Sequence, residues 1–363
     1  KRSILASGDW QMLFAAHNNS GGSGGGWCAF QLNADTLYFN AWSDNWRQTN
    51  RLFRDVAAWY HIVLAVDTTQ STADDRIKIY VNGTMISHSD FQIKNNPAED
   101  ADLGVNSTVK HRLGAVDYAS DNGNYDGYMA EVHFIDGTAL TPSSFGETNP
   151  ATGQWIPKEV TSVTYGTNGF YLKFVSGAIG TDSSGEGNNY TANNIVNDDI
   201  FLDSPTNNFA TANPLSAGTG IDWYQGNLVP YQPTQSNFGV TVSTIAVESG
   251  KYYAEFRLRG TDSNAQYIGA GTYVPIVNNS NQNGNGSGNV VLFPQNTTAA
   301  YRAIVVDGTA VTSSIAAGSQ GDKYGVALDA DNAKVYFYRN GSAIGSTDGY
   351  DITDVGTGKY HFI

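Results

Sequence analysis

The sequence predicts an all-β protein built from antiparallel sandwiches, and two observations support this fold class. The first is composition: the 363 residues include 40 Gly, 21 Tyr and 16 Phe, whereas charged residues make up only 15 %. Aromatic residues favour strands and Gly favours turns. The second is pattern: residues 77–81 alternate apolar and polar side chains and run into Asn82-Gly83, and Asn-Gly is the strongest short-range hairpin signal. The length allows two or three domains with real cores.

Residues 1–150 are expected to form the first sandwich. Alternating or aromatic-rich runs predict strands at 10–16, 27–32, 36–40, 59–67, 76–82, 112–116 and 127–135. The second and third of these strands should form a hairpin around Asn33-Ala34-Asp35. The strand at 127–135 should direct Met129, Glu131 and His133 to one face. Thr141 followed by Pro142 is typical of a helix start, so we expect the only short helix there.

Residues 151–215 are expected to form an irregular, packed connecting region. Their apolar density is low, with one strand-like run at 169–174 and turn-rich stretches at 182–189 and 203–209. A connection of this length without a helix usually packs on its neighbours or has a function.

Residues 216–363 are expected to form the second sandwich. Strand patterns occur at 251–256, 321–329 and 334–339, and the last runs into Asn340-Gly341. The stretch from Asp329 to Asn332 begins like a calcium loop, but it lacks the Gly and the closing Glu of such loops. It is predicted to be a hairpin turn.

Charge and hydropathy exclude several classes of partner. The net charge is −14, and no Lys/Arg cluster is present. An acidic surface repels phosphate backbones, so we expect no nucleic acid partner. No apolar stretch is long enough to cross a bilayer, so we expect no membrane insertion.

Cys28 is the only cysteine, which excludes a disulfide within the chain. It lies between Trp27 and Ala29 in a strand-like run, where a buried, inert thiol is the expectation. Stability must therefore come from core burial, with oligomerisation or ions as further contributors.

Two parts of the chain resemble known domains. The segments 58–67, 76–83 and 127–141 resemble, in order and spacing, a laminin-G or pentraxin type of concanavalin-like domain. The series SGKYYAEF, GDKYGVALD and KVYFYRNG resembles the SPRY domain, another concanavalin-like sandwich. Both resemblances imply a recognition scaffold. The resemblances also imply that the N-terminal strand of the first domain and the closing strands of the second lie outside the chain, which is expected to be an internal piece of a larger protein.

The succession of segments along the whole chain resembles structural proteins of tailed bacteriophages, notably marine ones. The segments that carry this resemblance, besides the two domains, are GTNGFYLKF, DSSGEGNNYTANNI and DSPTNNFATANPL. The resemblance implies a tail fibre or adhesin at the virion surface or tail, and it supplies no catalytic residues. The expected partners are a host-surface glycan or receptor, other virion proteins, and copies of the chain itself in a trimer.

One loop is a candidate calcium site, although no cofactor is required. Laminin-G and pentraxin relatives often bind calcium at a rim of the sandwich. The loop from Asp117 to Gly127 supplies carboxylates at Asp117, Asp121 and Asp126, and calcium prefers oxygen ligands of this kind. Glu99, Asp100 and Asp102 would add to the site if the two rims coincide. The alternative is a solvated Asx-turn loop without an ion.

Two groups of aromatic and amide side chains are candidate glycan contacts, because flat rings cover sugar faces while amides and carboxylates hold hydroxyl groups. The alternative is that Trp42 or Trp46 closes the edge of the sandwich. The candidate residues are Trp42, Asp44, Asn45 and Trp46, with Tyr118, Asn122, Asn124 and Tyr125.

The sequence predicts a protein that is not an enzyme. A glycosidase needs two carboxylates across a cleft, and Glu131 and Asp136 are five residues apart in a predicted strand, which directs them to opposite faces. No nucleophile, zinc or phosphate-binding motif is present. A purely architectural virion protein, such as a capsid decoration or tail connector, is the main alternative to an adhesin. A polysaccharide depolymerase is the third.

Overall fold

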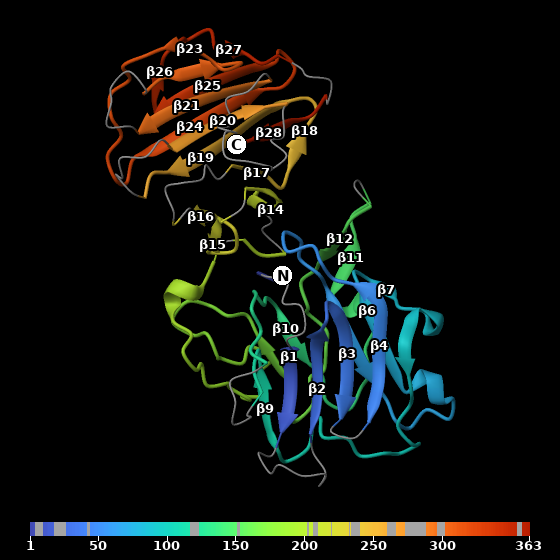
Figure 1. Ribbon diagram of the computed structural model, residues 1–363. Helices are drawn as coiled ribbons and strands as arrows, with labels where there is room; N and C mark the ends of the chain where they lie inside the picture. The colour runs from blue at the N-terminus through green and yellow to red at the C-terminus, as the bar shows by residue number, and fades with distance from the viewer. Residues whose placement is uncertain are drawn as a thin grey trace. The chain divides into compact units, whose positions relative to one another are not determined.

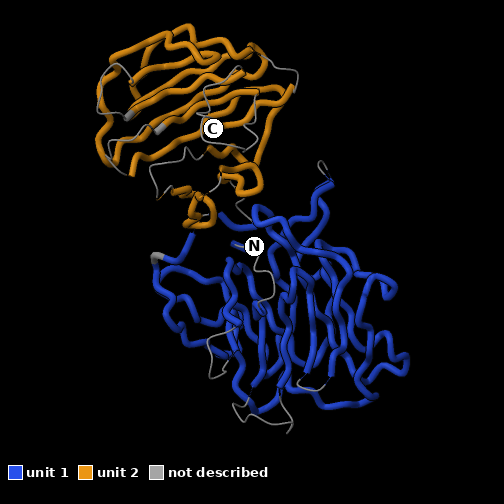
Figure 2. Tube along the Cα trace, in the orientation of Figure 1, with its two compact units in different colours: residues 1–209 blue, residues 210–363 orange. Residues whose placement is uncertain are grey.

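The chain forms two compact all-β units, residues 1–209 and residues 210–363 (Figure 2). A computed structural model describes residues 1–3, 10–17, 27–41, 44–116, 123–150, 153–201, 203–205, 210–218, 220–231, 233, 240–259, 266–272, 288–295, 302–353 and 358–363. Strands, turns and short 3-10 helices make up these ranges, and no α-helix occurs in them. The predicted fold class is confirmed.

Unit 1 contains a six-stranded antiparallel sheet with the strand order β8-β4-β3-β2-β1-β9, of which Figure 1 labels β4, β3, β2, β1 and β9. The predicted hairpin around Asn33-Ala34-Asp35 is confirmed as β2 and β3, with Asn33 opposite Thr36. The strands are β1 (Trp10–His17), β2 (Cys28–Asn33), β3 (Thr36–Ala41), β4 (Asn45–Leu52), β8 (Phe91–Lys94) and β9 (Lys110–Leu113).

A second layer packs on this sheet and completes the sandwich. The predicted pairing of the strands within 59–67 and 76–82 is confirmed as β5 (Ile62–Val66) and β6 (Ile77–Val81), which continue into β7 (Thr84–Met85). Buried side chains from the two layers form one core: Phe30, Leu32, Leu37 and Phe39 from the first sheet and Ile77, Ile79 and Val81 from β6. Alternation of apolar side chains along each strand produces this core, because successive side chains point to opposite faces.

The region after residue 127 differs from the prediction. Only Val132–Phe134 (β10) forms a strand within 127–135, and Glu131 has φ 51°. A left-handed residue interrupts the extended backbone, so the predicted face shared by Met129, Glu131 and His133 is wrong. The helix expected at Thr141 is a 3-10 turn, Pro142–Ser144 (η3). It is not the only one, because Ala73–Asp75 (η1), His88–Asp90 (η2) and Asn197–Asp199 (η4) form similar turns.

Residues 151–215, expected as a connecting region, fall in both units. Those up to 209 belong to unit 1, where β13 (Phe170–Leu172) pairs with β10 and β12 (Trp155–Pro157) pairs with β11 (Gly146–Thr148). The Asp182 carboxylate accepts hydrogen bonds from the backbone of Tyr171, Ser184 and Asn188. Since Tyr171 lies on β13, these bonds tie the turn-rich stretch at 182–189 to a strand of unit 1.

Unit 2 is a second antiparallel sandwich. One sheet has the order β18-β28-β20-β21-β22-β23, and the other has β19-β24-β25-β26 with β27 beside β25. Their shared core includes Val290, Leu292, Ile304, Val326, Leu328, Val335 and Phe337. The strands are β18 (Ala246–Val247), β19 (Lys251–Arg257), β20 (Gln266–Gly271), β21 (Asn289–Gln295), β22 (Ile304–Val306), β23 (Thr309–Thr312), β24 (Lys323–Asp329), β25 (Lys334–Arg339), β26 (Ser342–Ile344), β27 (Tyr350–Asp351) and β28 (Tyr360–Phe362).

Two strand pairs and one turn complete unit 2. The pairs are β14 (Ala212–Ala217) with β17 (Thr241–Ser243), and β15 (Asp222–Tyr224) with β16 (Val229–Tyr231). The stretch after Asp329 joins β24 to β25, and the Asp329 carboxylate accepts hydrogen bonds from the backbone and side-chain nitrogens of Asn332. The prediction of a hairpin turn there is confirmed.

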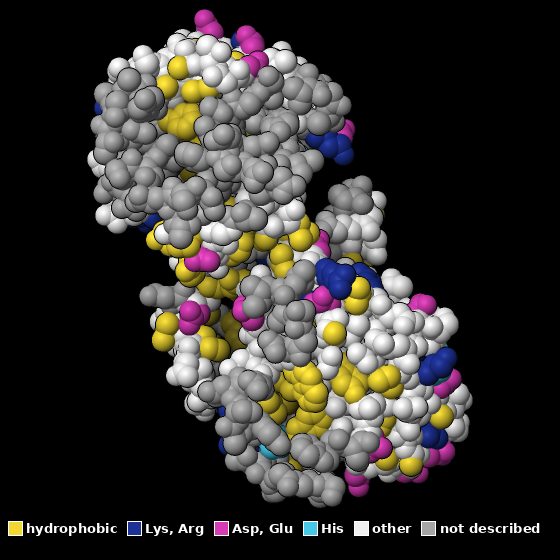
Figure 3. Space-filling model, viewed as in Figure 1, with side chains coloured by type: hydrophobic (Ala, Val, Ile, Leu, Met, Phe, Trp, Pro, Cys, Tyr) yellow, Lys and Arg dark blue, Asp and Glu magenta, His cyan; other side chains and the backbone are white. Residues whose placement is uncertain are grey.

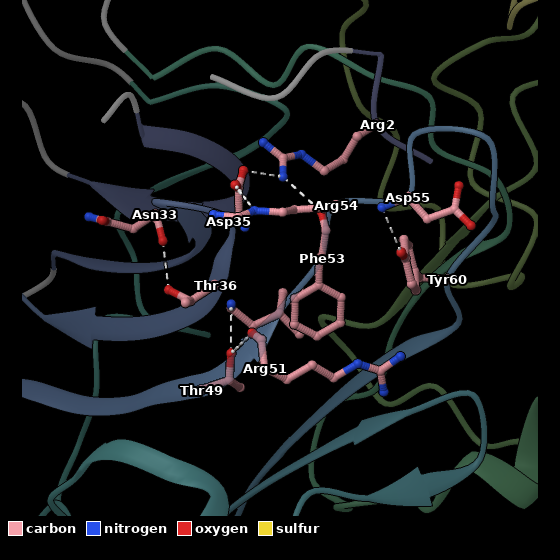
Figure 4. Close-up of polar contacts among 11 residues, drawn as sticks. Arg2, Asn33, Asp35, Thr36, Thr49, Arg51, Phe53, Arg54, Asp55 and Tyr60 are labelled. Atoms are coloured by element: carbon pink, nitrogen blue, oxygen red, sulfur yellow. Dashed lines mark hydrogen bonds and ion pairs between the residues drawn. The ribbon is translucent and has the colours of Figure 1, made fainter. Parts of the chain in front are cut away.

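The turn between β2 and β3 is held by ion pairs rather than by favourable turn residues. Ala34 and Asp35 have φ 46° and 65°, values that favour Gly or Asn. Arg2 Nη1 lies 2.7 Å from Asp35 Oδ1, and Arg54 Nε lies 2.9 Å from Asp35 Oδ2; Figure 4 shows these contacts. Burial pushes the pKa of Asp35 upward, but the hydrogen bonds from Arg54 and Arg2 outweigh it and hold the pKa below its usual range.

Cys28 is fully buried in the core of unit 1. Burial raises the pKa of its thiol, because the charged thiolate is disfavoured away from water. The prediction of an inert core thiol is confirmed. In the part of the chain that the structure describes, no helix has the length and apolar character needed to span a membrane.

Glycine is required at position 83 by its surroundings as well as by its backbone. Gly83 has φ +80°, and a Cβ added there would lie 2.3 Å from the ring of Trp155. That ring cannot retreat freely, because it stacks on His61 and donates a hydrogen bond to His61 Nδ1. Gly137 has a similar φ of +85° with nothing within 4 Å of the added Cβ.

We expect Gly83→Ala to destabilise unit 1 more than Gly137→Ala. Both variants bear the backbone strain of a left-handed Ala, about 1 kcal/mol, and Gly83→Ala adds an overpacking cost of about 2 kcal/mol. Denaturant unfolding of each variant measures the difference. Equal losses of unfolding free energy would contradict the close packing of Trp155 on this turn.

Candidate functional site

The outer face of the six-stranded sheet is the candidate site of unit 1. Phe30 and Leu32 on β2, and Leu37 and Phe39 on β3, point into the core. The residues between them therefore point outward. Cross-strand register then aligns outward residues over several strands, since directly opposite residues share a face. One row runs Met12, Gln31, Tyr38, Gln48 and Ile93.

This outward surface is rich in amides. Five of its side chains carry an amide, and we call the set the amide face: Gln31, Asn33, Asn40, Asn45 and Gln48. Gln31 Nε2 donates to Asn40 Oδ1 at 2.9 Å, and Gln48 Nε2 donates to the Thr36 hydroxyl at 3.0 Å. Tyr38 donates its hydroxyl hydrogen to Asn45 Oδ1. The amide face is thus an ordered network of neutral donors and acceptors.

Exposure on the amide face increases from its centre to its ends. Gln31 is 0 % exposed and its Oε1 atom is buried without a hydrogen-bond partner. Tyr38 and Asn40 are also buried, whereas Asn45 is exposed and Trp10, opposite Asn33, is 46 % exposed. Burial raises the pKa of Tyr38, so its hydroxyl stays a donor at neutral pH.

The same face carries little charge. Figure 3 shows hydrophobic side chains gathered over the region of β1 to β4, with Lys, Arg, Asp and Glu mostly nearer the edges of unit 1. An uncharged surface of amides, a phenol and an exposed indole can hold hydroxyl groups and an apolar ring face.

The predicted glycan contacts within residues 42–46 differ in their exposure in the structure. Trp42 lies outside the described residues, and Asp44, just before β4, and Asn45, its first residue, are exposed. Trp46 is only 5 % exposed and packs on Phe39, with ring centroids 5.0 Å apart. Its place in the core corrects the expectation that Trp46 contacts ligand.

The candidates at 117–126 are only partly described. Asp117, Tyr118, Asp121 and Asn122 lie outside the described residues, and Asn124 and Asp126 are exposed. Tyr125 packs against the core and donates to Lys1 O at 2.7 Å, and burial raises the pKa of its hydroxyl. Tyr125 is therefore a packing residue rather than an exposed ring.

The described members of the two candidate acidic groups, Asp126 and Glu99, have neighbours at opposite ends of the sheet. Ser3 N donates to Asp126 O, next to Arg2 and the turn at Asp35 where β3 begins. Glu99 pairs with Arg76 at 3.1 Å, near the start of β4, where Asn95 donates to Asn45 O. The structure therefore does not bring Asp126 and Glu99 together. The described ranges contain no cluster of three or more His, Cys, Asp or Glu side chains able to hold a metal, and the calcium site stays a prediction because Asp117 and Asp121 lie outside them.

Glu131 is part of an aromatic cluster, not of a carboxylate pair. Tyr171 donates its hydroxyl hydrogen to Glu131 Oε2, and His133 stacks on Tyr171 with ring centroids 4.0 Å apart. His133 Nδ1 lies 2.8 Å from the Tyr165 hydroxyl. Asp136 is engaged elsewhere, accepting a hydrogen bond from Asn106 Nδ2 at 2.6 Å.

Burial is the main cause that lowers the pKa of His133 to about 4, with smaller contributions from the nearby positive charges of His61 and Lys173. His133 is therefore neutral in the folded protein at neutral pH. This cluster stabilises the contact between β10 and β13.

The amide face was not among the predicted ligand contacts, because it lies on strands, whereas the predicted contacts lie in loops rich in aromatic residues. A signal was present: in residues 28–33 and 36–40, amides and Tyr38 alternate with apolar residues along strands. An uncharged polar residue at every second strand position marks an outward face.

Comparison with known families and structures gives one sequence match and several structural ones. Residues 3–144 match a family model described as the concanavalin A-like lectin/glucanases superfamily. No curated protein matches the chain. The SPRY domain of human HERC1 is similar at 15 % identity and a TM-score of 0.32, covering 42 % of this chain and 86 % of that one. The TRIM65 PSpry domain has the same identity and TM-score, covering 42 % and 82 %. At these values the structural likeness carries no argument.

The low pKa of His133 predicts a loss of stability in acid. Its ordinary pKa is 6.5 and its folded pKa is about 4, so between these values the unfolded chain binds a proton that the folded chain does not. The unfolding free energy of unit 1 should therefore fall as pH decreases from 6.5 to 4, by on the order of 3 kcal/mol from this group. Chemical unfolding of wild type and His133→Gln across this range measures it, and the variant should lose less stability.

His88→Gln is the matched control, because the His88 side chain is 37 % exposed. The control should keep the wild-type pH dependence. If His133→Gln also keeps it, the buried neutral state of His133 is wrong.

Proposed function

We propose that unit 1 is a non-catalytic recognition module that binds a neutral saccharide on the amide face. The observation that carries this proposal is the uncharged amide face, which is open to a ligand at Asn45 and beside the exposed Trp10 ring. Gln31 itself is 0 % exposed, so its unpaired Oε1, which costs about 1–3 kcal/mol, lies beneath this surface and out of reach of a ligand. The match of residues 3–144 to a superfamily of lectins and glucanases supports a binding role.

The chemistry of the face suits a sugar better than a charged ligand. Amides both donate and accept, as sugar hydroxyls do. The exposed Trp10 ring, opposite Asn33 at the edge of the amide face, supplies an apolar surface for a sugar ring. A charged ligand would find no ion-pair partner among Gln31, Asn40 and Gln48.

On the resemblance to phage structural proteins we further propose the biological setting. The chain would act in a tail fibre or adhesin at the virion surface, in contact with a host-surface glycan and other virion proteins, as a homotrimer. No cofactor is required, and calcium at Asp117, Asp121 and Asp126 is an accessory. An architectural virion protein would use the same face against protein instead.

We expect the purified chain to bind neutral glycans on an array. Trp10→Ala and Asn45→Ala should each weaken this binding about tenfold, which corresponds to a loss of roughly 1.4 kcal/mol of binding free energy. Both residues are exposed, so the variants should fold. Tyr224→Ala is the control, since Tyr224 is 50 % exposed in unit 2. Repeating the assay with a calcium chelator tests the accessory site.

Three outcomes would contradict parts of this proposal. Unchanged binding by Trp10→Ala and Asn45→Ala would exclude the amide face. Absence of binding to any neutral glycan by the folded chain would favour the architectural role. Unchanged binding with chelator would remove calcium from recognition.

A further inference from the structure

A second exposed face, in unit 2, has different chemistry. Val326 and Leu328 on β24, and Val335 and Phe337 on β25, point into the core, so the residues between them point outward. The cross-strand register then aligns these outward side chains in two rows across β19, β24 and β25. One row is Tyr253, Ala327 and Tyr336, and the next is Glu255, Gly325 and Tyr338.

Small residues on the central strand leave room for aromatic rings on this face. A Cβ added to Gly325 would lie 2.2 Å from the Tyr253 hydroxyl, so the Tyr253 ring lies over Gly325. Tyr253 and Tyr338 have ring centroids 6.4 Å apart in an edge-on arrangement. Tyr253 is nevertheless 55 % exposed. We call Tyr253, Tyr336 and Tyr338 the tyrosine face.

Charges on the two sides of the tyrosine face differ. On one side Lys251 pairs with Asp329 at 2.8 Å, and Lys334 pairs with Asp351 at 2.8 Å. On the other side Arg257 lies directly opposite Lys323 across β19 and β24. Both are exposed, and neither forms an ion pair with any described residue. Like charges directly opposite destabilise a sheet, and an anion bound between them would relieve the repulsion.

Glu255 adds a condition on the ligand. It lies in the row beside Arg257 and accepts a hydrogen bond from Tyr253 at 3.2 Å. Its exposed carboxylate repels an anion placed directly beside it, so the anion of the ligand must lie at Arg257 and Lys323, but it accepts hydrogen bonds from sugar hydroxyls, which acidic peptide side chains do not offer. The ligand must therefore offer an apolar ring face, hydroxyl donors and an anion together.

We propose that this face of unit 2 binds a saccharide whose ring carries a carboxylate, such as a uronate. The sugar ring lies against Tyr253 and Tyr338, its hydroxyls donate to Glu255, and its carboxylate lies between Arg257 and Lys323. Arg suits this role because its guanidinium can hold a carboxylate through two parallel hydrogen bonds. The proposal is independent of the amide face in unit 1.

Calorimetric titration of the full chain with oligogalacturonate tests the proposal, with the fully methyl-esterified oligosaccharide as the matched neutral probe. We expect the ester to bind at least tenfold more weakly, and added salt to weaken only the charged probe. Arg257→Gln, Lys323→Gln and Tyr253→Ala should each weaken binding about tenfold.

Two controls separate this site from general effects. Lys359→Gln removes an exposed cation before β28, in the other sheet of unit 2, and should leave binding unchanged. Trp10→Ala should also leave it unchanged, which keeps this test distinct from that of the amide face. Circular dichroism melting confirms that each variant folds.

Several results would overturn the proposal. These are no binding by the folded chain, equal affinity for the acid and its ester, and unchanged affinity in Arg257→Gln and Lys323→Gln. Loss of binding in the Arg257 and Lys323 variants but not in Tyr253→Ala would mean ion attraction without a sugar platform. Tighter binding of poly-glutamate than of oligogalacturonate would mean a peptide ligand.

Discussion

The register between β2 and β3 is the constraint on which the rest of unit 1 depends. It directs Phe30, Leu32, Leu37 and Phe39 into the core and Gln31, Tyr38 and Asn40 to the opposite face. A slip of one residue would exchange the two sets and destroy core and amide face together. The turn that sets this register carries strained residues at Ala34 and Asp35. Contacts from distant parts of the chain, Arg2 and Arg54, hold it in place.

In both units one face of a sheet packs the core and the other faces outward, but the outward side chains differ in chemistry. In each, alternating side chains fill a core with one face of a sheet and leave the other face free to carry polar or aromatic groups. Unit 1 presents amides without charge, whereas unit 2 presents tyrosines beside Arg257 and Lys323. One fold principle can therefore supply two outward surfaces with different chemistry.

Much of the fold could be predicted because it depends on local signals. The alternating strands, the Asn82-Gly83 turn and the buried Cys28 follow from nearest neighbours in the sequence. The sequence left Trp46 between a ligand contact and a packing role at the sandwich edge, and strand periodicity could not decide, because Asn40 pairs with Asn45 while Phe39 pairs with Arg47. Trp46 is the extra residue of a bulge, which strand periodicity does not reveal. The position of Glu131 could not be predicted either, because its left-handed backbone occurs together with a hydrogen bond to Tyr171, forty residues away in the sequence. The amide face required knowledge of which strands are neighbours.

The single cysteine gives unit 1 a built-in reporter of its own opening. Cys28 is fully buried in the core of that unit, and no other thiol exists in the chain. A thiol-modifying reagent can reach it only when the sandwich opens locally or globally. The rate of labelling under native conditions therefore measures the free energy of that opening for unit 1 alone, without a signal from unit 2 and without any engineered label.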